Sequence, residues 1–177
     1  EDNKLGLAVF AQNTAKDAWD ANGDGFTELS KISGQTAGLR GYVKTGLYSK
    51  LSFEYHHLQE FRRGGDNLSL PPHEAMIAEQ TDHGINTGGV KFDWFSPDQK
   101  HRINSFLSLQ HINRESYYGA NKNPNAYGMT TDLTWVGGAQ YVYKADKCIF
   151  MPSDLTLGLE YNEDYLKDNA WGYNRVT

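Results

Sequence analysis

Apolar and polar residues alternate along most of this chain, and this alternation is the clearest structural signal in the sequence. Residues 155–162 (Leu-Thr-Leu-Gly-Leu-Glu-Tyr-Asn) carry apolar side chains at odd positions and small or polar ones at even positions. Side chains of a β-strand point alternately to its two faces, so this segment predicts a strand with one apolar face. Residues 133–144 show the same pattern and predict a second strand.

Five further segments alternate less regularly and complete a set of seven predicted strands, with no convincing helix among them. Phe10, Phe95 and Phe106 interrupt the alternation, and we interpret them as residues of the polar, lumen-facing side or as bulge positions. The five segments are 4–13, 36–44, 51–58, 89–95 and 103–111.

The connections between the predicted strands alternate strictly between short and long. The short ones are 45–49, 96–100 and 145–153. The long polar ones are 19–31, 60–84, 116–131 and the tail after residue 165. In an up-and-down meander, successive connections fall on opposite rims, so this sheet should have one smooth rim and one elaborate rim. Outer-membrane barrels show that asymmetry, with short periplasmic turns and long extracellular loops.

Composition sharpens this interpretation. Only 38% of the residues are hydrophobic, yet 13% are aromatic, including 11 tyrosines and 4 tryptophans. The sequence contains no run of about 18 apolar residues, so it offers no candidate transmembrane helix. Membrane β-strands do not need such a run, because their lipid-facing apolar residues alternate with lumen-facing polar ones and their mean hydropathy is therefore low. Aromatic residues gather near the predicted strand ends, and strands of about 9–11 residues would suit a tilted membrane span. A secreted soluble β-sandwich, whose strands alternate equally well, is the alternative.

Seven strands are too few for a large closed barrel, and an open sheet facing lipid would leave unpaired edges in hydrocarbon. We therefore expect residues 1–177 to form a single segment of a larger transmembrane β-barrel, an all-β antiparallel meander whose remaining strands lie elsewhere. The net charge of −5 and the absence of a long basic cluster argue against a nucleic-acid partner. No spacing of Ser, His or acidic residues indicates a catalytic set, so we do not expect an enzyme.

Several segments resemble the barrel region of TonB-dependent outer-membrane receptors of Bacteroidetes-type bacteria, closest to those for cobalamin or siderophores. They are 24–29 (DGFTEL), 54–65 (EYHHLQEFRRGG), 71–75 (PPHEA), 78–83 (AEQTDH), 91–98 (KFDWFSPD), 123–128 (NPNAYG) and 159–162 (LEYN). The resemblance spans essentially the whole chain but only part of the family's architecture, a barrel of about 22 strands with a plug inside.

The resemblance implies a part of an energy-coupled transporter in the outer membrane of a Gram-negative cell, with its long loops extracellular. Its partners would be outer-membrane lipid, a nutrient ligand, TonB acting through a plug that these residues do not include, and a surface lipoprotein. Cobalamin or a related corrinoid is the first substrate expected, and a ferric siderophore is the second. No organic cofactor is expected.

Residues 20–28 (DANGDGFTE) contain oxygen-bearing side chains at a spacing of two, followed by a glycine. Asp20, Asn22, Asp24 and Glu28 therefore form a candidate calcium site, since hard oxygen ligands suit this cation. The segment is no EF-hand, because its twelfth position is Lys31. A tight turn without metal explains Asn-Gly and Asp-Gly equally well. The resemblance favours calcium, because cobalamin receptors use it to order extracellular loops.

The long loops supply the candidate ligand-binding residues. Arg62 and Arg63 could hold an anionic chelate or phosphate through their forked donors, or form salt bridges with Glu60 or Asp66 instead. Their loop also carries His73. Aromatic rings in the third long connection suit a large polar ligand, although exposed loops often have that composition. These aromatic residues are Tyr117, Tyr118 and Tyr127.

Overall fold

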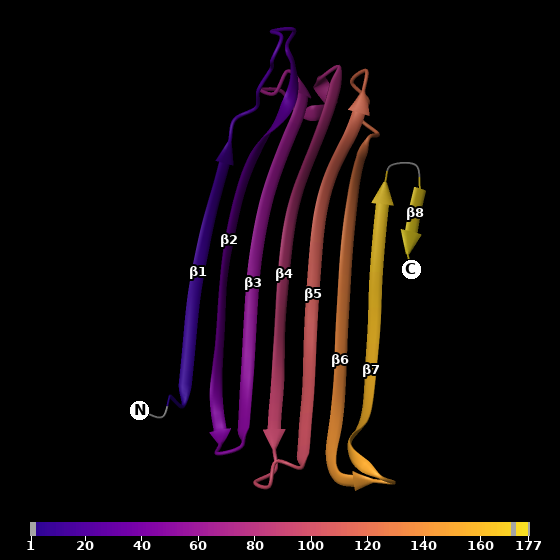
Figure 1. Cartoon of the computed structure of the whole chain (residues 1–177). Helices are drawn as coiled ribbons and strands as arrows, with labels where there is room; N and C mark the ends of the chain where they lie inside the picture. Colours follow the sequence, from indigo (N-terminus) through magenta and orange to yellow (C-terminus); the bar gives the residue numbers. More distant parts are fainter. Residues whose placement is uncertain (1–2, 171–172, 177) are drawn as a thin grey trace.

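The computed structural model describes residues 3–170 and 173–176 and shows one antiparallel sheet with its strands in chain order (Figure 1). The strands are β1 (Leu5–Lys16), β2 (Phe26–Gly46), β3 (Ser49–Asp66), β4 (Ile77–Phe95), β5 (His101–Ala120), β6 (Tyr127–Cys148), β7 (Met151–Ala170) and β8 (Tyr173–Val176). One short 3-10 helix, η1 (Pro72–Glu74), precedes β4. The predicted all-β meander is confirmed. None of the described helical segments is long or apolar enough to cross a membrane.

The strands are about twice as long as the sequence pattern predicted. β2 to β7 each have between 18 and 22 residues. The upper halves of these strands carry polar residues on both faces, so they lack a hydropathy signal even though the backbone ladder continues through them. Much of what the sequence indicated as long loops is therefore strand.

With the longer strands, the connections still alternate between short and long. The lower rim in Figure 1 holds the connections 47–48, 96–100 and 149–150, and the upper rim holds 17–25, 67–76 and 121–126. The tail after Tyr165 continues as β7 to Ala170 and pairs there with β8. Residues 171, 172 and 177 of that tail lie outside the described residues.

The sheet is open. β1 pairs only with β2, and β8 covers only Lys167–Ala170 of β7, so most of β7 has no described strand on its far side. Both edges thus present backbone N–H and C=O groups without a ladder partner among the described residues.

The cross-strand register sorts the side chains into two different faces. Leu5 pairs with Val43, Val43 with Leu51, and Leu51 with Phe92, and the same row continues to Leu159 of β7. Directly paired residues point to the same side. We call this side the apolar face and the opposite side the polar face.

The lower half of the apolar face forms a continuous apolar band across β1 to β7, and Asp, Glu, Lys and Arg do not occur in it. We define the band as the apolar-face positions within 5–11, 37–43, 49–55, 88–94, 101–109, 133–143 and 155–161. Its residues are half-buried or exposed, with Leu157 at 74% and Leu7 at 64% exposure. No described element packs over this band, so its apolar side chains have no protein core to enter.

Three aromatic residues that break the alternation lie on the polar face without any shift of register. Phe10 pairs with Gly38, Phe106 with Gly138, and Phe95 with Arg102. Gly38 and Gly138 each leave room for the aromatic ring of the paired residue, since a Cβ on Gly138 would lie 2.7 Å from Cε1 of Phe106. The positions are therefore polar-face residues and not bulges.

Replacing Gly38 with alanine should destabilise the sheet, because the new Cβ would lie 2.8 Å from the backbone oxygen of Tyr55 as well as against the Phe10 ring. We expect a loss of about 1–3 kcal/mol in the free energy of unfolding. Urea unfolding followed by tryptophan fluorescence measures it. The control is Gly84→Ala, whose Cβ meets nothing within 4 Å and should change stability by less than about 0.5 kcal/mol. Equal effects would contradict the packing argument.

Candidate functional site

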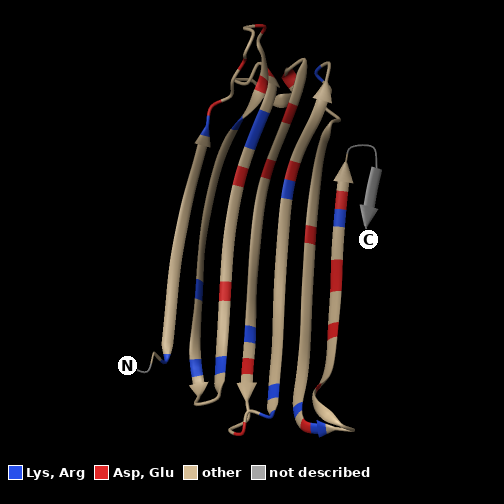
Figure 2. Cartoon of the chain, viewed as in Figure 1, with Lys and Arg blue, Asp and Glu red and all other residues tan. Residues whose placement is uncertain are grey.

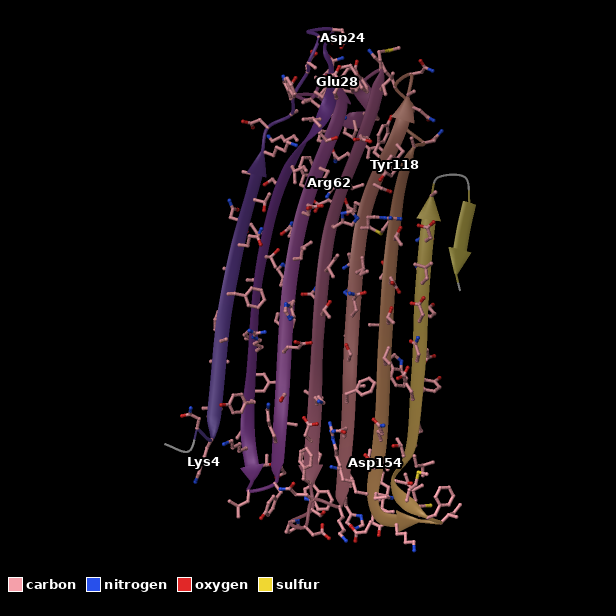
Figure 3. The ribbon with its side chains drawn as sticks, viewed as in Figure 1. Lys4, Asp24, Glu28, Arg62, Tyr118 and Asp154 are labelled. Carbon is pink, nitrogen blue, oxygen red and sulfur yellow. The ribbon has the colours of Figure 1, made fainter. Side chains whose placement is uncertain are left out.

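The upper half of the polar face carries a hollow of about 380 Å³ that gathers charged and polar side chains from three neighbouring strands. The register explains how they meet: Glu60 of β3, His83 of β4 and Arg114 of β5 occupy one transverse row, and Glu79 pairs with Tyr118 four residues higher. Residues of the hollow are Glu60, Arg62, Glu79, Gln80, Thr81, His83, Arg114 and Tyr118. Arg62 and Tyr118 lie in the upper half of the sheet in Figure 3.

The two arginines of the hollow are held differently. Arg62 Nε donates to Glu60 Oε1 at 2.7 Å, which is the salt bridge expected from the sequence. Arg114 Nη2 donates to the Thr130 hydroxyl at 3.0 Å, and that hydroxyl donates to Asp168 Oδ1 at 2.6 Å. Arg114 Nε is buried and has no hydrogen-bond partner. A charged donor without a hydrogen-bond partner therefore lies buried beside the hollow.

This arrangement suits a polar ligand that carries both hydrogen-bond acceptors and donors. Two guanidinium groups offer forked donors, two carboxylates offer acceptors, and the exposed ring of Tyr118 offers a stacking surface. The sequence analysis identified Arg62 and Tyr118 but missed Arg114, Glu79 and His83. These three belong to the hollow only through the pairing register of β3, β4 and β5, which their local sequence does not reveal.

The other four predicted ligand residues lie at the upper rim on the opposite side of the sheet, where they hold the loops together. Tyr117 is 1% exposed and packs against Ala75 and Ala78. Its hydroxyl donates to the Asn123 carbonyl at 2.9 Å. The ring of Tyr127 packs edge-on against Tyr117. We call this group the rim cluster.

Arg63 and His73 complete the rim cluster. Arg63 is 2% exposed and donates to the carbonyl oxygens of Gly64 and Asp66 at 2.6 and 3.4 Å. Burial lowers the pKa of the Arg63 guanidinium, and the nearby charge of Asp66 opposes that shift. His73 Nδ1 lies 2.7 Å from the Tyr127 hydroxyl. Arg62 and Arg63 are adjacent in sequence, so their side chains lie on opposite faces of the sheet.

Asp66 fastens the loop 67–76 to the end of β3. Its carboxylate accepts the backbone N–H of Ile77 at 2.9 Å and that of Met76 at 3.3 Å. These hydrogen bonds, the one from Ile77 foremost, lower the pKa of Asp66 below its ordinary value of 3.8. A carboxyl whose pKa is lower in the folded state stabilises that state above the unfolded pKa and loses this effect as the pH falls through the folded value.

Asp66→Ala should open the loop 67–76 at neutral pH, because the N–H groups of Met76 and Ile77 lose their acceptor. Hydrogen exchange at Ile77 should become severalfold faster at pH 6. In the unchanged protein the protection of Ile77, relative to the intrinsic exchange rate at each pH, should fall only below about pH 4. Asp98→Ala, at the lower rim, is the control and should leave Ile77 exchange unchanged. Slow exchange in the Asp66 variant would refute this role.

The loop 17–25 and the start of β2 hold the candidate calcium residues at the upper tip of the sheet, where Figure 3 labels Asp24 and Glu28. Asp20 accepts backbone N–H groups from Gly23 at 2.7 Å and Gly25 at 2.8 Å. These bonds, the one from Gly25 foremost, lower the pKa of Asp20. Backbone donors therefore stabilise this carboxylate.

The remaining candidate ligands are held in similar ways. Asp24 accepts the Phe26 N–H at 2.8 Å, Glu28 accepts the Ala21 N–H at 2.7 Å, and the Asn22 amide donates to Asp24 at 3.0 Å. Among the described residues, no three His, Cys, Asp or Glu side chains come together as metal ligands. The tight-turn explanation accounts for this geometry, and calcium binding stays a prediction.

Comparisons with known proteins add no relative: no protein-family model matches the chain, and searches of curated proteins and of solved structures found no match.

Proposed function

We propose that this chain forms part of the wall of a TonB-dependent outer-membrane receptor, in which the apolar band faces lipid and the polar face lines the lumen. The observation that carries the proposal is the separation of the two faces. A band without Asp, Glu, Lys or Arg crosses seven strands on one side, while charged residues occupy the other. Lipid is the solvent that such an exposed apolar surface requires.

The dimensions and the edges of the band support this arrangement. From Leu133 to Tyr143, at about 3.3 Å per residue and a strand tilt of about 40°, the band rises about 25 Å, the height of the apolar belt of outer-membrane barrels. At its upper edge the Trp135 indole donates to Glu163 at 3.1 Å. At its lower edge the Tyr141 hydroxyl lies 2.6 Å from His101 Nδ1. Aromatic rings with one wet end favour such interfaces.

A soluble β-sandwich explains these features less well. A sandwich buries one face of each sheet against a second sheet, and its strands average about 5–6 residues. Here β2 to β7 have at least 18 residues each, and the described elements leave the apolar band uncovered. The open edges at β1 and β7 also require neighbouring strands, because unpaired backbone groups are costly in lipid. The larger receptor would supply them.

Within this receptor, the hollow on the upper polar face is our candidate for ligand capture at the extracellular end. Its mixed donors and acceptors suit a large polar nutrient, with cobalamin as the first substrate and a ferric siderophore as the second. TonB would drive uptake through a plug inside the barrel. A surface lipoprotein is a further partner, and calcium at Asp20, Asn22, Asp24 and Glu28 would order the tip of the upper rim.

The membrane assignment predicts that alternate residues of β7 meet lipid and water. Nitroxide labels placed one at a time at positions 155 to 161, in a Cys148→Ser background, should collide with oxygen at odd positions and with an aqueous nickel chelate at even ones. Leu157 and Thr156 form the matched pair. A protein that remains a stable monomer without detergent, with Leu157 shielded from both reagents, would favour the soluble sandwich instead.

The ligand assignment predicts that cyanocobalamin binds the intact receptor that contains this chain, as measured by calorimetric titration. Arg62→Ala should weaken binding about tenfold, or about 1.4 kcal/mol, whereas Lys122→Ala on the β5–β6 turn should change it less than twofold. Weaker binding in a chelator, reproduced by Asp24→Ala, would support the calcium site. Absence of binding in both buffers would remove cobalamin and leave ferric siderophores to be tested.

A further inference from the structure

A transverse row of uncharged amide side chains lies on the apolar face, directly above the apolar band. Two residues along β2, or about 6.6 Å, separate Gln35 of this row from Ala37 at the upper edge of the band. Directly paired residues point to the same side of a sheet, so the members of the row share one face. We call it the amide row; its members on β1, β2, β3 and β5 are Asn13, Gln35, Gln59 and Asn113.

The four amides are exposed and are not used inside the chain. Among the described residues, their side-chain atoms form no hydrogen bond. The polar side chains just below the row differ, since Asn86 Oδ1 accepts the Tyr55 hydroxyl at 2.7 Å and lies 2.9 Å from His57 Nδ1. A side-chain amide offers two N–H donors and a carbonyl acceptor. The row therefore directs both donors and acceptors away from the sheet.

The spacing and the level of the amide row suit a membrane headgroup with several polar groups. Asn13, Gln35 and Gln59 lie on three consecutive strands, so neighbouring amides are about 4.8 Å apart. The proposed function places the apolar band in lipid and the upper rim outside the cell. The amide row then lies at the level of the headgroups of the outer leaflet.

The charges around the amide row disfavour an anionic headgroup. Asp82 of β4 pairs directly with Glu115 of β5 one step above the row on the same face. Figure 2 shows acidic residues in the upper halves of these two strands. Across β1 to β5, the amide row and the rows next to it on this face contain neither Lys nor Arg. Clusters of Lys and Arg are what anionic lipid headgroups require, so an uncharged headgroup fits this surface better.

We propose that the amide row binds the uncharged sugar headgroup of a glycolipid in the outer leaflet. The inference rests on the proposed function, which places the apolar face in lipid. A sugar hydroxyl donates and accepts hydrogen bonds, as each amide does, and it carries no charge for Asp82 and Glu115 to repel. The acyl chains of the same lipid would lie against the apolar band directly below, so one lipid molecule would contact both surfaces.

Photocrosslinking of the intact receptor that contains this chain tests the proposal. The receptor is placed in phosphatidylcholine vesicles with equal amounts of digalactosyldiacylglycerol, an uncharged glycolipid, and anionic phosphatidylglycerol. 4-Benzoylphenylalanine replaces either Ala37, exposed beside the amide row, or Leu157 within the apolar band. At Ala37, mass spectrometry should find about fivefold more adduct with the glycolipid than with phosphatidylglycerol, equivalent to about 1 kcal/mol. At Leu157 the two adducts should be nearly equal.

Two double variants isolate the contribution of the amides. Gln35→Leu/Gln59→Leu keeps the size of two directly paired side chains and removes their hydrogen-bonding groups. It should lower the adduct ratio at Ala37 to the ratio at Leu157. The control Gln12→Leu/Gln140→Leu makes the same change on the polar face and should leave the ratio at Ala37 unchanged.

The proposal is overturned by an adduct ratio at Ala37 equal to that at Leu157, by an excess of phosphatidylglycerol there, by the absence of lipid adducts there, or by equal effects of the two double variants. Any of these results together with lipid adducts at Leu157 refutes the glycolipid contact alone. Absence of lipid adducts at both positions refutes the membrane wall as well.

Discussion

The continuous ladder of backbone hydrogen bonds between neighbouring strands is the constraint on which the rest of this structure depends. Because side chains alternate along each strand, the register of one pair decides which side every residue occupies. From β1 to β7 the registers stay in phase for the length of the apolar band. A slip of one residue between two strands would place charged residues such as Arg40 or Glu160 on the apolar side.

The polar face depends on the same constraint in a different way. On this face, the register brings together side chains that are far apart in sequence: Glu60, His83 and Arg114 form a row. It also sets Lys44 against Lys50. The upper hollow combines charges of both signs, whereas Lys and Arg outnumber Asp and Glu in the lower half of β2 to β5 (Figure 2).

The upper rim shows how the loops are fixed without a large core. Tyr117, Tyr127 and Ala75 pack into a small cluster, and buried Arg63 satisfies carbonyl groups at the end of β3. Asp66 and Asp20 use their carboxylates to accept backbone N–H groups of Met76 and Gly25, which lie in loops outside the strand ladder. Local hydrogen bonds of this kind hold the loops of the upper rim in place.

The sequence by itself determined the all-β class, the meander order and the existence of two unlike faces. The reason is that the alternation of apolar and polar residues can be read directly from neighbouring positions, as in 155–162. It did not determine strand length, since the upper halves of the strands are polar on both sides, as at Arg62 and Arg63. Nor did it separate these two arginines in function. Local spacing places neighbours on opposite faces, but only the paired strands decide that Arg62 joins Arg114 while Arg63 is buried beneath the rim loops.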